Sequence, residues 1–64
     1  MNISNTFDEI MGAIMRSETI SGLTNLHQEA NAAFANDRIS ADQVALLRKA
    51  ITVREDAIAQ LATL

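Results

Sequence analysis

The strongest constraint on the fold is a segment beginning at Ser40, after which no glycine or proline interrupts a helix. Its first residues, SADQ, place Ser40 three positions before Gln43, which is the spacing of a capping box. Ile39 before the cap and Val44 in the first turn provide the apolar pair of a hydrophobic staple. A helix of roughly 24 residues would extend about 36 Å. Because this is long for a chain of 64 residues, we expect a dominant C-terminal helix over about 41–63.

Two shorter helices are expected before it. The first begins at Thr6, because a glutamate follows three residues later and apolar residues then recur at helical spacing. It covers about 6–16. Near residues 17–19 the apolar residues no longer fall on the same face of a continuous helix. We therefore expect a break there and a second helix over about 18–35. The sequence therefore predicts an all-α fold, a single domain over 1–64, in which the second and third helices form a helical hairpin.

The connection between the second and third helices, NDRI, contains residue types found in calcium loops. An EF-hand loop requires glycine at its sixth position and glutamate at its twelfth. If Ile39 takes the apolar eighth position, Asp37 stands at the sixth and Gln43 at the twelfth. Only Asn36, at the fifth position, fits a ligand. We interpret the segment as a turn followed by a helix cap, not as a calcium site.

The second helix is expected to pack through one apolar face and to carry the only histidine near its edge. His27 is interpreted as a partly buried structural residue, because a metal site needs further ligands and the chain has no cysteine and no second histidine. We therefore expect no metal and no cofactor. The expected face consists of Ile20, Leu23, Leu26, Ala30, Ala33 and Phe34.

The third helix has an apolar arc that covers about half of its circumference. A helix that packs against one neighbour needs a narrower stripe, so one side should pack within the chain and the other beyond it. The first helix could cover the second side and close a three-helix monomer. We favour a surface for self-association or partner capture, because the first helix is short. One side holds Val44, Leu47, Ile51 and Ile58, and the other holds Leu46, Ala50, Val53, Ala57, Leu61 and Leu64.

Arg54 interrupts the first side of this arc. A buried arginine without a partner is costly, so we expect it to contact Glu29, Asp8 or a carboxylate of a second chain. The alternative is a buried stem whose charged head reaches water. A lone polar group in an apolar seam also selects the pairing of helices. The predicted protein interface consists of Leu46, Val53, Arg54, Ala57, Ile58, Leu61 and Leu64.

Composition narrows the function classes. The chain carries eight acidic and five basic residues, a net charge of −3, whereas duplex-binding modules usually carry a basic stripe. Direct nucleic-acid binding is therefore disfavoured. No apolar run is long enough for a membrane span, and the N-terminus lacks the pattern of a signal peptide. With no cysteine, these features favour a cytoplasmic protein, and the small core favours a homo-oligomer.

The sequence contains no recognised catalytic or phosphate-binding signature, so we do not expect an enzyme. The leading interpretation is a small protein-interaction module, acting as an adaptor, antagonist or inhibitor through its apolar helical surface. Its size and composition are common among products of phages and mobile elements. One alternative is a helix-turn-helix regulator, because the short connection NDRI permits that motif. A second is an acidic DNA mimic, in which Asp8, Glu9, Glu18, Glu29, Asp37 and Asp42 would line one surface.

Overall fold

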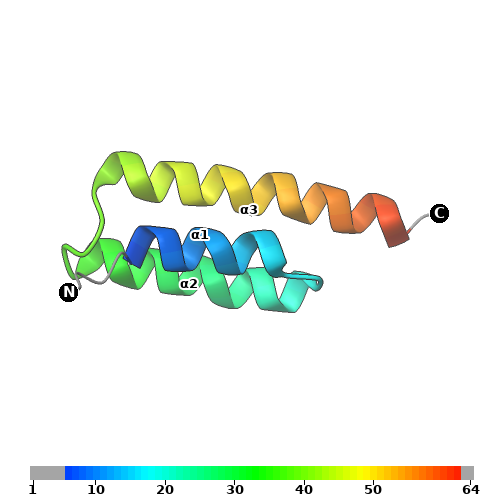
Figure 1. Ribbon diagram of the computed structural model, residues 1–64, viewed down its shortest axis with the longest axis horizontal. Coiled ribbons are helices and arrows are strands. Elements are labelled where there is room, and N and C mark those ends of the chain that lie inside the picture. The colour runs from blue at the N-terminus through cyan, green and yellow to red at the C-terminus, as the bar shows by residue number, and fades with distance from the viewer. Residues whose placement is uncertain (1–5, 63–64) are drawn as a thin grey trace.

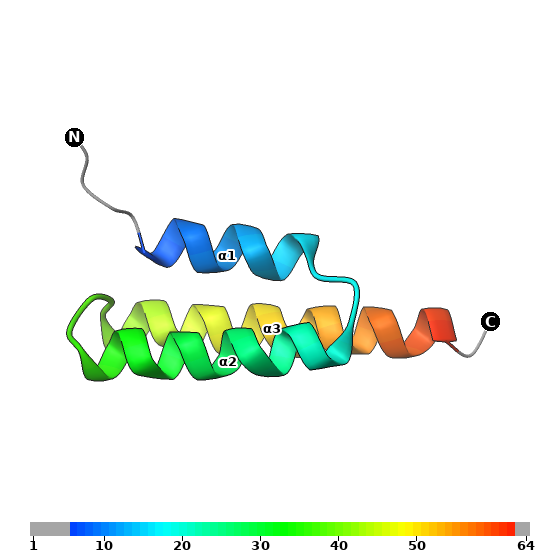
Figure 2. The same ribbon diagram turned by 90° about the horizontal axis from the view of Figure 1, so that it is seen from below.

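The computed structural model describes residues 6–62 (Figure 1). Three helices contain most of these residues: α1 (Thr6–Arg16), α2 (Ile20–Ala35) and α3 (Ala41–Ala62). No strand occurs within the described range. α1 and α3 run in the same direction, and α2 runs opposite to both (Figures 1 and 2). The predicted all-α fold with a long C-terminal helix is confirmed.

The break between α1 and α2 lies where the apolar phase is lost. Thr19 occupies the N-cap of α2, and its hydroxyl accepts a hydrogen bond from the Gly22 N–H at 3.0 Å. This cap makes α2 begin two residues later than predicted, so Glu18 belongs to the connection. A Cβ atom at position 22 would approach the Ser17 hydroxyl oxygen to 2.9 Å. Glycine at this position therefore lets the connection fold closely onto the first turn of α2.

The end of α2 has the hydrogen bonds of a Schellman motif. The Arg38 N–H donates to the Ala33 carbonyl at 2.9 Å, and the Asp37 N–H donates to the Phe34 carbonyl at 3.1 Å. Asp37 has a φ of 60°, in the left-handed region that aspartate tolerates better than most residues. The stretch NDRI thus forms the turn that the sequence predicts, and it reverses the chain into α3.

The start of α3 contains the predicted capping box. The Gln43 N–H donates to the Ser40 hydroxyl at 3.1 Å, and the Ser40 N–H donates to the Gln43 side-chain oxygen at 3.0 Å. Ile39 and Val44 are both buried, as the staple requires. The first turn of α3 is therefore held by local contacts and by the core together.

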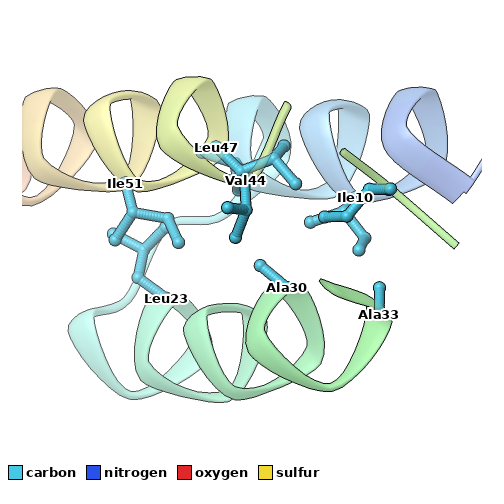
Figure 3. Packing of buried hydrophobic residues seen from close by; sticks show 9 residues of the cluster. Ile10, Leu23, Ala30, Ala33, Val44, Leu47 and Ile51 are labelled. Atoms are coloured by element: carbon cyan, nitrogen blue, oxygen red, sulfur yellow. The ribbon is translucent and has the colours of Figure 1, made fainter. Parts of the chain in front are cut away.

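The core lies between the three helices. Side chains from all three point toward one another there (Figure 3). Leu23, Leu47 and Ile51 are almost completely buried, and the two buried alanines of α2 let its backbone lie close to its neighbours. The buried residues are Ile10 and Ile14 of α1, Leu23, Ala30 and Ala33 of α2, Val44, Leu47 and Ile51 of α3, and Ile39 of the connection.

α2 packs through a narrower face than predicted. Ile20 and Phe34 remain 44% and 42% exposed, and His27 is exposed rather than partly buried. The prediction that Ile20 and Phe34 belong to the packed face is wrong, and so is the prediction that His27 is partly buried. Ala30 and Ala33 are buried against the neighbouring helices. α2 therefore directs these small residues toward the core, and its larger apolar residues remain at the edge of the interface.

Candidate protein interface

Arg54 joins α3 to the end of α1. Its side chain is partly buried, and its Nε donates to the backbone carbonyl of Ser17 at 2.9 Å. This carbonyl directly follows α1, where a helix leaves unsatisfied acceptors and a partial negative charge. The prediction of a carboxylate partner is wrong for the Nε atom of Arg54, because the backbone carbonyl of Ser17 accepts its hydrogen bond instead. This hydrogen bond also places the last turn of α1 beside Arg54 along the axis of α3.

The inner row of α3, which we define as Val44, Leu47, Ile51 and Ile58, faces the core. Leu47 and Ile51 are 0% and 2% exposed, so the predicted packing of this side within the chain is confirmed. Ile58 is only partly buried. α3 extends past the α1–α2 connection (Figures 1 and 2), so neither shorter helix reaches far enough to enclose Ile58.

The outer row of α3 is defined as Leu46, Ala50, Val53 and Ala57. Arg48, on the opposite flank of α3, bonds to Asn31 of α2, so the outer row lies on the flank nearer to α1. Leu46 is 53% exposed and Val53 is 60% exposed. Ala50 and Ala57 are partly buried. α1 packs against α3, but it covers the inner row and leaves the two large residues of the outer row in contact with solvent.

Two methionines of α1 extend this apolar surface. Glu9 and Ala13 line a groove with α2, so the opposite flank of α1, which carries Met11 and Met15, borders α3. Met11 packs partly against the core, whereas Met15 is 63% exposed. The contact between Arg54 and the end of α1 places Met15 within about one helical turn of Val53 along the axis. Met15 was not among the residues predicted for the interface, although it lies one turn after Met11.

The last two turns of α3 contribute a separate region. Leu61 is 67% exposed, and it lines an open groove of about 480 Å³ together with Glu18, Arg54, Ile58 and Ala62. The floor of this groove is apolar, and its two charged residues lie near the α1–α2 connection. Leu64, the last residue of the predicted interface, lies outside the described residues.

Metal-ligating side chains do not cluster in the described part of the chain. Within residues 6–62, no group of three or more His, Cys, Asp or Glu side chains is arranged to hold a metal ion. No helix in that range combines the length and apolar character needed to cross a bilayer.

Comparison of the chain with protein-family models, with curated proteins and with solved structures finds no match.

Proposed function

We propose that this chain is a small, non-enzymatic interaction module that binds protein through the outer row of α3, the adjoining methionines of α1 and the groove at Leu61. Single exposed apolar residues are normal on protein surfaces. Here Met15, Leu46 and Val53 lie along one junction between two helices, and all three are more than half exposed. Apolar surface grouped in this way normally marks an interface. This grouping is the observation that carries the proposal.

The arrangement of α2 and α3 favours this function over a helix-turn-helix regulator. The two helices lie side by side in opposite directions (Figures 1 and 2), whereas helix-turn-helix pairs cross at about 90–120°. Arg48, which would be a candidate for phosphate contacts, donates instead to the Asn31 side-chain oxygen at 2.7 Å.

The acidic residues likewise do not favour a DNA mimic. Glu18 lies in the α1–α2 connection, whereas Asp37 lies in the α2–α3 connection and Asp42 in the first turn of α3, at the opposite end of α2 (Figure 2). A mimic requires its carboxylates along one continuous surface. We therefore propose an adaptor, antagonist or inhibitor that works in the cytoplasm, a setting compatible with the absence of cysteine.

Aspartate substitutions in the apolar surface test the proposal. Val53→Asp and Leu61→Asp place a charge at exposed positions, so each should preserve the helicity seen by circular dichroism. A different protein captured by the purified chain should bind at least one of the two variants on the order of tenfold less tightly, because a carboxylate would have to be desolvated in the contact.

The controls are Ala45→Asp and Ala59→Asp, which introduce the same charge at exposed positions on the polar side of α3. They should bind like the unmodified chain. If Val53→Asp and Leu61→Asp retain self-association and all captured proteins at control levels, the proposed function is wrong.

A further inference from the structure

The outer row of α3 has the spacing of a coiled-coil seam. Leu46, Ala50, Val53 and Ala57 follow one another at intervals of four, three and four residues, which is the alternation of the d and a positions of a heptad. Leu46 and Val53 take the d positions, and the two alanines take the a positions. α3 therefore has a second helix-packing seam, beside the one that faces its own core.

We propose that the occupant of this seam is a second copy of the chain, whose α3 packs antiparallel against the first. This inference rests on the proposed function and names the partner for one part of its surface. In an antiparallel pair, the residues at the a positions face the residues at the d positions of the partner. When Ala50 faces the partner's Val53, Leu46 faces the partner's Ala57, and two-fold symmetry repeats both contacts.

The packing in this register is complementary in size. Each layer combines one large and one small side chain, which keeps the distance between two helices constant along their length. The register also aligns Ala41 with the partner's Ala62, so that the two helices overlap along their full length of about 33 Å. The exposed Leu46 and Val53 then both become covered.

The charges beside the seam favour the antiparallel direction. Lys49 and Asp56 precede the two alanines by one residue and are both exposed. In antiparallel coiled coils such positions face each other, and the register of the apolar layers places Lys49 beside the partner's Asp56, twice in the dimer. The two residues are about 10 Å apart along their own helix, too far to pair within one chain.

A parallel pair would not use these charges. There, the row of Lys49 and Asp56 would face the row that contains Leu47 and Arg54. Leu47 is fully buried in its own core, and Arg54 is bonded to the Ser17 carbonyl.

Met15, beside the seam, would contact the antiparallel partner with a flexible side chain suited to an irregular surface.

Leu61 lies outside this seam, turned toward the inner row, so its groove is not part of the proposed contact. Leu61→Asp should therefore leave the dimer intact while it weakens the binding of a different protein. Val53→Asp should disrupt the dimer. These two variants separate the dimer from the broader interaction function.

Disulfide trapping tests the direction of the helices, because the chain has no cysteine of its own. Leu46→Cys mixed with Ala57→Cys should give a mixed disulfide under mild oxidation, and neither variant should cross-link efficiently alone. In a parallel pair the two positions are about 16 Å apart along the axis, beyond the reach of a disulfide. Cross-linking of each variant with itself, and not of the mixture, would overturn the proposal.

Charge exchange tests the register. In sedimentation equilibrium we expect the unmodified chain to dimerise and Lys49→Asp to weaken the dimer on the order of tenfold, since each of two attractions becomes a repulsion. The double variant Lys49→Asp/Asp56→Lys should restore association, with unchanged helicity in all three proteins. Failure of the double variant to restore the dimer would overturn this register.

A chain that stays monomeric at all concentrations would also overturn the dimer. The proposed function would nevertheless stand if Val53→Asp or Leu61→Asp lost a captured protein. Both proposals would be wrong if Val53→Asp and Leu61→Asp matched their controls in self-association and in protein capture.

Discussion

The inner and outer rows of α3 are both apolar but have opposite surroundings. Leu47 is fully buried, whereas Leu46, its neighbour in the chain, is 53% exposed. α1 and α2 together enclose the inner row, and no described segment encloses the outer row. Burial of a leucine is worth about 1.5–3 kcal/mol, so the inner row stabilises the monomer while the outer row can contribute fully only upon association.

The inner row also changes along its length. Ile51 is 2% exposed, while Ile58, two turns later, is only partly buried. Arg54 stands between them, at the level where α1 ends. The core is therefore most tightly packed along the first two thirds of α3, and the last two turns pack less completely and present apolar surface to solvent.

Truncation of the two adjacent leucines gives the largest expected difference in the free energy of unfolding. Leu47→Ala should lower the free energy of unfolding by about 2–5 kcal/mol, because it leaves a cavity in the core. A single core in a chain of this size supplies only about 3–5 kcal/mol, so a large fraction of this variant should be unfolded at 25 °C.

Leu46→Ala is the matched control and should cost less than about 0.5 kcal/mol when urea unfolding is measured at concentrations low enough to keep the chain monomeric. Equal losses for Leu46→Ala and Leu47→Ala would remove the distinction between the rows.

Truncation of the two isoleucines tests the change along the inner row. Ile58→Ala should lower the free energy of unfolding by about 1 kcal/mol, because the side chain is only partly buried. Ile51→Ala should lower it by about 2–5 kcal/mol. Thermal unfolding followed by circular dichroism gives both values, and a loss at Ile58 as large as that at Ile51 would show that the end of α3 belongs to the core.

Replacement of Arg54 has the smallest expected effect of the three. Arg54→Met keeps much of the apolar stem and removes the hydrogen bond to the Ser17 carbonyl, which should cost about 1 kcal/mol in the free energy of unfolding. Arg48→Met, on the exposed flank, should cost about 0.5 kcal/mol or less. Hydrogen exchange should locate the loss: amides of the last turn of α1 should exchange faster in Arg54→Met, and unchanged protection there would contradict the role of Arg54.

Several details of the fold could be predicted because they depend on residues close together in the chain. The capping box of Ser40 and Gln43, the break near Thr19 and the turn at Asp37 each use hydrogen bonds that span five residues or fewer. The assignment of Val44, Leu47 and Ile51 to one buried side follows from helical spacing alone. Such features need no knowledge of what the helix packs against.

The errors arose where two or more helices decide the outcome. Ile20, His27 and Phe34 lie at the edge of the apolar stripe of α2, and helical spacing does not say how far α2 rotates about its axis. Packing around Ala30 and Ala33 sets that rotation. The partner of Arg54 could not be found for a related reason, since a backbone carbonyl at position 17 has no signature in the side-chain sequence.

By itself, the sequence determined three helices, the capping box of α3 and the two apolar rows of α3, because hydrogen bonding and side-chain spacing act locally along the chain. Only the tertiary structure decided which row is covered. The lengths of α1 and α2 and the direction from which they approach α3 leave Leu46, Val53 and Leu61 exposed, since the area that a short helix can bury is limited to the surface it reaches.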